Sequence, residues 1–574
     1  MDMITLFRRN VFFCLLIFFQ FSCNSHDKAD LVIHGGKVYT VNGANQVAEA
    51  VAVEGDKITF VGSMADAEKL IGDKTKVIDL QGKILTPGFI EGHAHLMNVG
   101  YNELELDLSQ IRSYDEMIDK VREAASKSSP GEWILGRGWH QDKWSVKPEG
   151  MVKGFPIHKK LSEVSPDNPV LLEHASGHAA LANAKAMELA GVNQLAIEKN
   201  KLEGGDGGEV VRDALGNPTG LFNERAMELI EEYVPARTGE KGASALGLAI
   251  NACQRNGITS FHDAGATRED IDLFHQFKKD GKLGVRIYAM VTGRDSDLVY
   301  EWLRKGPEID STTMLTIRAI KLNCDGALGS RGAWLLEPYT DRPDFSGMAT
   351  LSMDTVMKIS REALKHGFQV CSHAIGDRAN REILDRYEIA FKENPAQSSD
   401  HRFRIEHAQH LHPNDIPRFG KQGVIPAMQA IHMSSDRPWA IERLGEQRIT
   451  EGAYMWQELL KSGARIVNGT DAPVEPLNPI PSFYASVTRK TLQGLPEGGY
   501  EPAQKMTRAQ ALRSYTLDAA FGAFEEKTKG SIERGKLADF TVFSSDLMTI
   551  PENQILETEV SMTILGGKLV YEKP

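Results

Sequence analysis

Basic residues are too few in this chain to favour a nucleic-acid partner. Lysine and arginine number 66 against 78 aspartate and glutamate residues, which gives a formal net charge of −12 at pH 7. Binding to phosphates needs a basic face, and the sequence has no run of lysine and arginine that supplies one. We therefore expect no nucleic acid as a partner. The acidic balance itself says nothing about the charge of a substrate.

Cysteine is also scarce. Cys14 and Cys23 lie near the N-terminus, and the other three, Cys253, Cys324 and Cys371, form no CxxC pair. This spacing argues against a thiolate metal cluster, and an odd number gives no disulfide framework. We expect these three side chains to be small buried apolar groups.

The apolar run near the N-terminus is too short to span a bilayer comfortably. It has about eleven residues, from Val11 to Phe21, and two arginines precede it. We interpret residues 1–22 as a signal peptide. A small residue followed by Cys23 resembles a bacterial lipoprotein signal, although Gln20 stands where an aliphatic residue is usual. A plain secretory signal is the alternative.

The lipoprotein interpretation makes Cys23 the lipidated first residue of the mature chain. An acyl chain attaches a protein to a membrane without a spanning helix. We therefore expect an exported protein, lipid-anchored to a bacterial membrane and facing the periplasm or the cell exterior. The anchor is its only expected membrane contact.

Strand patterns divide the long chain into several parts. Residues 30–86 and 530–574 are rich in short β-runs separated by Gly and Asp, which predicts one small β-sandwich domain built from both ends. Between them, eight short apolar strands end in polar residues, and helical stretches lie between some of them. This alternation predicts the α/β class and a closed (β/α)₈ barrel of the TIM type at 87–98 and 237–529.

Residues 99–236 are too many for a barrel loop. We expect them to form an insertion subdomain after the first barrel strand, over the barrel mouth.

The first barrel strand ends in two histidines. His93 and His95 are two residues apart, so in a strand both imidazoles point to the same face, about 7 Å apart along the backbone. Two such imidazoles can converge on one metal ion. An HxH pair alone is a weak signal, because two histidines can fall so by chance. Its position at the end of an apolar strand favours metal ligands.

Four later strands also carry a reactive residue. Lys321 lies inside an apolar strand, where a charged ammonium is costly to bury. It is either an outward-facing lysine or one with a lowered pKa that carries CO₂ as a carbamate and so becomes a ligand. His373 and His407 end successive strands, and Asp471 ends the last. The ordinary alternatives are a core histidine and an aspartate in a turn. Because all three residues stand at the mouth of one barrel, we predict that they are metal ligands and that Asp471 is also a proton shuttle.

In this order the sequence resembles the amidohydrolase superfamily, with HxH after strand one, lysine on strand four, histidines on strands five and six, and aspartate on strand eight. The spellings GFIEGHAH, KLNCDGALGSR, SHAIGD, IEHAQ and NGTDAP are similar to its amidohydrolase-3 branch, which includes YtcJ-like proteins and N-substituted formamide deformylases. The resemblance covers nearly all of the chain after the leader. His140 departs from it, since the branch often has an acidic residue there.

The resemblance implies a metal-dependent hydrolase that cleaves a C–N bond, of an amide or an N-substituted formamide, with metal-activated water. It implies one or two divalent ions at the six positions above, zinc first and manganese or iron as alternatives, with Lys321 carboxylated if two ions bind. Asp471, the predicted catalytic acid and base, would take the proton of the water and pass it to the leaving nitrogen. The implied partner is a small-molecule amide, and a homodimer is one assembly that the sequence leaves open.

Four further residues are predicted to contact the substrate. His178 lies in the insertion and would reach the barrel mouth, where Trp139 would form an apolar wall. Asp325 and Arg331 follow Lys321 and would shape its loop or touch the substrate. A purely structural role is the alternative for each.

A second hypothesis keeps the fold but removes the turnover. The chain would then be a catalytically silent binding or regulatory protein. The filled site argues against this, because all six positions hold residue types that are competent for the chemistry.

Overall fold

The computed structural model describes residues 28–192, 208–235 and 239–574. Its central sheet has eight parallel strands in the order β21-β20-β19-β18-β17-β16-β15-β8. Their bounds are β8 Phe89–Ala94, β15 Ile258–Ala266, β16 Arg286–Thr292, β17 Leu315–Asn323, β18 Gln369–Ala374, β19 Arg404–His407, β20 Ile425–Met428 and β21 Val467–Asn468. These are the eight strands that the sequence predicts, and the α/β barrel class is confirmed.

The first and last strands of this sheet are joined by a side chain and by bonds beyond the strand ends. The Glu91 carboxylate on β8 accepts hydrogen bonds from the backbone N–H of Thr470, at 2.9 Å, and from its hydroxyl, at 2.8 Å. Past β21, the Asp471 N–H donates to the His93 carbonyl at 2.8 Å, and the His95 N–H donates to the Ala472 carbonyl at 2.9 Å. The barrel is therefore closed at the level of the predicted metal ligands.

Helices follow the barrel strands in the expected alternation. They are α2 Leu96–Asn102, α7 Gly239–Arg255, α8 Arg268–Lys279, α9 Ser296–Lys305, α10 Met353–His366, α11 Asp377–Glu393, α12 Ile416–Gln422, α13 Ala430–Gly452, α14 Trp456–Lys461, α15 Pro479–Thr488, α16 Arg508–Ser514 and α17 Leu517–Gly522. The apolar faces of these helices and of the strands form one large core. A barrel filled in this way is a rigid support for groups at its mouth.

A second sheet forms the insertion after β8. Its order is β13-β14-β12-β11-β10-β9, with parallel pairing from β9 to β11 and antiparallel pairing from there to β13. The bounds are β9 Leu106–Asp107, β10 Ile134–Trp139, β11 Val170–His174, β12 Ala179–Ala182, β13 Gly208–Arg212 and β14 Pro218–Glu224, with helices α3 Tyr114–Lys127, α4 Lys159–Val164, α5 Ala184–Leu189 and α6 Glu228–Glu231. Separate apolar clusters pack within this unit.

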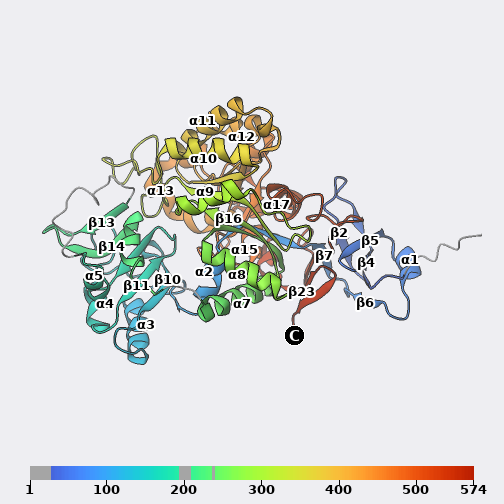
Figure 1. Cartoon of the computed structure of the whole chain (residues 1–574), viewed down its shortest axis with the longest axis horizontal. Helices are drawn as coiled ribbons and strands as arrows, with labels where there is room; N and C mark the ends of the chain where they lie inside the picture. The colour runs from blue at the N-terminus through green and yellow to red at the C-terminus, as the bar shows by residue number, and fades with distance from the viewer. Residues whose placement is uncertain (1–27, 193–207, 236–238) are drawn as a thin grey trace, which may run out of the picture.

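Two smaller sheets pack together at the other end of the molecule (Figure 1). One has the order β5-β4-β1-β6, and the other, β24-β23-β22-β7-β2-β3, combines strands from both ends of the chain. The bounds are β1 Leu31–His34, β2 Lys37–Tyr39, β3 Val47–Ala48, β4 Ala50–Glu54, β5 Lys57–Gly62, β6 Lys76–Asp79, β7 Ile84–Pro87, β22 Phe540–Phe543, β23 Val560–Leu565 and β24 Lys568–Glu572. This is the predicted sandwich, while the residue boundaries of the predicted domains stay predictions.

The N-terminal predictions fall outside the described residues. Residues 1–22 and Cys23, the predicted signal peptide and lipid anchor, belong to this part of the chain. Within the described residues, no helix combines the length and apolar character that crossing a bilayer requires. Three cysteines are described, Cys253, Cys324 and Cys371, and all are buried free thiols.

Candidate metal centre and active site

Six side chains that the sequence singles out meet at the carboxyl ends of the barrel strands. They are His93 on β8, His95 just after it, Lys321 on β17, His373 on β18, His407 at the end of β19 and Asp471 just beyond β21. Parallel strands of one barrel bring their carboxyl ends to the same rim, so residues far apart in the chain become neighbours there. Their roles as ligands stay predictions, but their convergence is a property of the fold.

Three of these residues form the tightest group. One ligand atom each of His93, His95 and Asp471 lies within 4.8 Å of the others. The Asp471 Oδ1 atom lies 3.3 Å from His95 Nε2 and 3.6 Å from His93 Nε2. Lys321 reaches the same point, with its Nζ 3.4 Å from His93 Nε2. Among the described residues, no carboxylate oxygen lies within ion-pair distance of this buried Nζ.

The centre favours neutral imidazoles and an ionised carboxylate. Burial lowers the pKa of His93 to about 4, and the nearby Lys321 charge lowers it as well. Burial also lowers the pKa of His95, His373 and His407. Burial alone would raise the pKa of Asp471, but the surrounding imidazoles outweigh it and hold that pKa well below its ordinary value. Neutral imidazole and ionised carboxylate are the forms that bind metal ions.

Unsatisfied polar atoms show that a cation fits here. His373 Nε2 and Asp471 Oδ1 are fully buried, and neither makes a well-formed hydrogen bond among the described residues, with Asp325 Oδ1 3.4 Å from the first and His95 Nε2 3.3 Å from the second. Buried polar atoms without partners are rare in folded proteins, and an ion is one of the groups that satisfies them. Imidazole nitrogen and carboxylate oxygen together form a donor set that suits zinc. The residues present therefore fit a divalent metal.

His407 is turned into the centre by an uncommon backbone conformation. Its φ is +72°, and the φ of Asp471 is +59°, a region that non-glycine residues seldom adopt. The Nδ1 atom of His407 lies 2.7 Å from Gln429 Oε1. Since an amide oxygen can only accept, Nδ1 carries the proton and Nε2 keeps its lone pair for a ligand role. Backbone strain of this kind clusters at functional sites.

A buried carboxylate that the sequence reasoning missed orients His93. Glu406 Oε2 contacts His93 Nδ1 and fixes the Nδ1–H form, so that Nε2 faces Asp471 and Lys321. Arg404 holds this carboxylate with two hydrogen bonds of 2.7 Å each and also donates to the Gly92 carbonyl at 2.8 Å. All three side chains are almost completely buried. Metal-binding histidines commonly have such a carboxylate behind them.

Glu406→Gln is expected to weaken zinc binding by about 10- to 100-fold, the usual cost of losing a partner of this type. The amide keeps the volume of the side chain but removes the charge that stabilises His93. The measurement is zinc affinity by competition with a chelating dye, with the melting temperature recorded alongside. An unchanged zinc affinity would show that Glu406 only supports the barrel interior.

A cavity of about 550 Å³ opens above this centre between the barrel and the insertion. Its floor includes His95, Lys321, His373, His407 and Asp471, and its walls include residues of β10, β11 and α8. Ligand sites in proteins are typically cavities of about 300–1,000 Å³ with a few polar groups. The size and position of this cavity therefore suit a small-molecule substrate.

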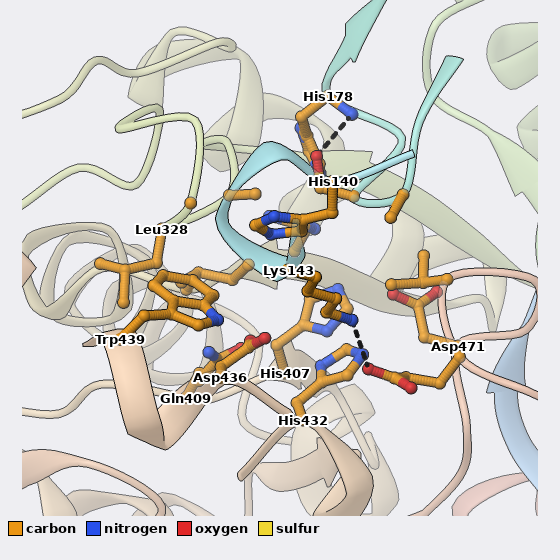
Figure 2. A pocket seen from close by; sticks show the side chains of 18 residues that line it. His140, Lys143, His178, Leu328, His407, Gln409, His432, Asp436, Trp439 and Asp471 are labelled. Carbon is orange, nitrogen blue, oxygen red and sulfur yellow. Dashed lines mark hydrogen bonds and ion pairs between the residues drawn. The ribbon is translucent and has the colours of Figure 1, made fainter. Parts of the chain in front are cut away.

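A much smaller cavity, of about 50 Å³, adjoins the larger one and shares lining residues with it (Figure 2). Trp439 and Leu328 line one side and Asp471 the other, with His140 above and His432 below. By the usual measure of about 10–15 Å³ for each water, it holds a few waters or one short chemical group. Six residues line both cavities: Ser176, His178, His373, His407, Asp471 and Val474.

The four predicted substrate residues have different surroundings. His178 lines both cavities, and its Nδ1 lies 2.7 Å from Glu224 Oε2. Trp139 lies instead in the core of the insertion, where its Nε1 donates to the Leu172 carbonyl at 2.8 Å. It lines neither cavity, because the apolar ring is fully buried among insertion side chains.

Asp325 and Arg331 serve the loops around the site. The Asp325 carboxylate accepts hydrogen bonds from the N–H groups of Trp334, Ile375 and Gly376, which fixes the chain just after His373. Arg331 pairs with Asp341 at 2.8 Å. Neither residue lines the two cavities, so their position favours the structural alternative.

Comparisons with known proteins identify the family of this chain. The profile of Amidohydro_3, described as an amidohydrolase family, matches residues 76–571. The putative amidohydrolase YtcJ of Bacillus subtilis is 32% identical over 94% of this chain and 99% of its own length. The N-substituted formamide deformylase of Arthrobacter pascens is 27% identical over 95% of this chain and 98% of its own length.

A solved structure is similar throughout. An uncharacterized metal-dependent hydrolase from Pyrococcus horikoshii has a TM-score of 0.71 and 26% identity, covering 91% of this chain and 99% of its own. The fold, the converging side chains and the family profile thus agree on metal-dependent hydrolysis. This chain belongs to the amidohydrolase family.

Proposed function

We propose that this hydrolase cleaves a C–N bond, that of an amide or an N-substituted formamide. The observation that carries the proposal is the position of Asp471, whose Oδ1 lies 3.3 Å from His95 Nε2 and 3.6 Å from His93 Nε2 at the floor of a cavity of about 550 Å³. An acceptor so placed can take a proton and return it to a leaving nitrogen. The relative named N-substituted formamide deformylase supports this bond type.

The metal centre is proposed to hold one or two divalent ions. His93, His95 and Asp471 would hold the first, with His373 and His407 completing the set and Lys321, as a carbamate, joining two ions. When bound, such an ion lowers the pKa of water from about 15.7 to about 7 and polarises a carbonyl oxygen. We propose zinc, with manganese and iron as alternatives.

Lys321 suits the carbamate role because of its surroundings. It is only 3% exposed, and burial lowers its pKa. A neutral amine is the form that adds to CO₂, and the resulting carbamate is an anion with two oxygen ligands. The ammonium form, in contrast, would place a cation 3.4 Å from a histidine nitrogen that is needed for a metal.

Asp471 moves the proton in the proposed reaction. Its carboxylate takes a proton from the attacking water, and the new acid donates it to the nitrogen as the C–N bond breaks. His178 reaches the same cavity from the insertion and is held by Glu224, so it can donate a hydrogen bond to the substrate carbonyl.

A screen of N-formyl and N-acetyl amines tests the proposal. The zinc-loaded protein is expected to release free amine, and removal of metal by a chelator is expected to stop the release until zinc is returned. Full hydrolysis by metal-free protein would contradict the proposal. Binding without turnover of any amide would instead favour the silent binding or regulatory protein.

The location of the protein is also a proposal. Cys23 would carry the lipid that attaches an exported chain to a bacterial membrane. Cys23→Ser is expected to move the protein from the membrane pellet to the soluble fraction, which immunoblotting after centrifugation measures. A variant that stays in the pellet would refute the anchor.

A further inference from the structure

A buried arginine lines the larger cavity without adequate partners. Arg137, on β10, is 6% exposed, and its Nε and Nη1 atoms are fully buried with no hydrogen-bond partner among the described residues. Its Nη2 makes one long contact of 3.4 Å with the Ala175 carbonyl. A buried guanidinium normally has its donors satisfied, because unpaired buried charge is costly. Arg137 therefore lacks an acceptor that a ligand can supply.

The neighbouring Glu173 does not fill this need. Its Oε1 lies 3.2 Å from Arg137 Nε, near enough for charge attraction but outside hydrogen-bond geometry. The carboxylate is more exposed than the guanidinium, at 25% against 7% for the two side chains. Glu173 thus keeps the arginine in place and leaves its Nη1 edge without a partner.

A glycine leaves space at the other end of the guanidinium. Gly177 lines the same cavity, and a methyl group in the position of its absent Cβ would lie 3.3 Å from Arg137 Nη2. Its φ of +72° also suits glycine. The loop between β11 and β12 therefore passes close to the guanidinium without a side chain that would block it.

We propose that Arg137 binds a carboxylate of the substrate, so that the amides cleaved at this centre carry a negative charge on the part that occupies the larger cavity. This inference rests on the proposed amide hydrolysis. The planar guanidinium matches a carboxylate with two parallel hydrogen bonds, which neutral amides cannot offer.

Other charged groups in the cavity have weaker claims. Arg294 also lines it but is exposed, as is Glu269. Glu231 and Asp270 are half-buried, and the Asp270 side chain closes the N-terminal cap of α8. Exposed charges are screened by water and salt, so these groups should hold an anion less firmly than the buried guanidinium does.

Matched pairs of ligands test the inference. N-acetylglycine is compared with N-isobutylacetamide, and N-acetyl-β-alanine with N-isopentylacetamide, because each neutral partner replaces the carboxylate by an isopropyl group. Affinities are measured by titration calorimetry on the zinc-treated full chain carrying Asp471→Asn, which is expected to turn over at least about 100-fold more slowly than the unaltered chain. The better anionic ligand is expected to bind roughly 10- to 100-fold more tightly than its neutral partner, the effect of a charge-assisted hydrogen bond.

Variants assign the effect to a residue. Arg137→Met should abolish the anionic preference, whereas Glu173→Gln should strengthen it by removing the nearby negative charge. Arg294→Met, which removes the exposed arginine of the same cavity, should leave it unchanged. Melting temperatures verify that each variant is folded. The comparison of charged with neutral ligands is made on the chain that keeps Arg137, so it stays valid even if Arg137→Met does not fold.

Two results overturn the inference: no anionic ligand binds more tightly than its neutral partner, or the preference survives Arg137→Met. Hydrolysis by the wild-type chain is measured separately with the same four compounds. Cleavage without anionic preference would keep the proposed function and reject the role of Arg137. An Arg137-dependent preference without cleavage would support the anion site and count against amide hydrolysis.

Discussion

Asp471→Asn is expected to lower kcat by about 10²- to 10⁴-fold on the best amide from the screen, the range that a general acid and base contributes. The asparagine has almost the same size but cannot take a proton from water or return one to nitrogen. Asp471 Oδ1 lies 3.3 Å from His95 Nε2, in the group of side chains that would hold the metal. The measurement is steady-state amine release.

Metal content distinguishes the loss of proton transfer in Asp471→Asn from a loss of the bound metal. An asparagine oxygen still offers a ligand, so the variant is expected to retain metal or to bind it only moderately less well, as elemental analysis of the purified protein shows. Unchanged kcat with metal in place would exclude Asp471 as the proton shuttle. Loss of all metal would assign it to binding rather than to proton transfer.

Lys321→Ala is expected to cost both metal and activity. If the carbamate of this residue joins two ions, its loss should lower metal affinity by more than the roughly 10- to 100-fold that removing a hydrogen-bond partner of a metal ligand costs. Metal per chain and kcat/KM are measured on the same preparation. A variant with full metal and full rate would make Lys321 a bystander.

A second buried lysine provides the matched control. Lys529 is also 3% exposed, but it pairs with Glu525 at 2.6 Å and donates to Ser260 at 2.8 Å. Lys529→Ala is therefore expected to lower the melting temperature without changing the metal content. Equal metal loss in both variants would show that removal of any buried lysine disturbs the centre.

Much of the fold was accessible from local patterns. The strands were predictable because short apolar runs end in polar residues, and His93 and His95 stand two residues apart at the end of one of them. The parallel order then follows from the alternation of strands with helices. The convergence of Lys321, His373 and Asp471 required only that all strand ends share one rim.

Long-range partners were not accessible in this way. Glu406 and His407 are adjacent, so strand alternation places them on opposite faces, and only the positive φ of His407 lets both act at the centre. Arg404 and Glu406, two residues apart in an apolar strand, were the available signal of a buried ion pair. The sequence also predicted that Trp139 would form an apolar wall of the site. Residues beside it line the cavities, but its own ring packs into the core of the insertion.

The most direct test of the account is the metal content of the purified protein, determined per chain by elemental analysis before and after incubation with zinc. The account predicts one or two divalent ions per chain, with about two supporting a carboxylated Lys321 and about one supporting a single-ion site. A chain that is metal-free and does not take up zinc would contradict the metal-dependent mechanism.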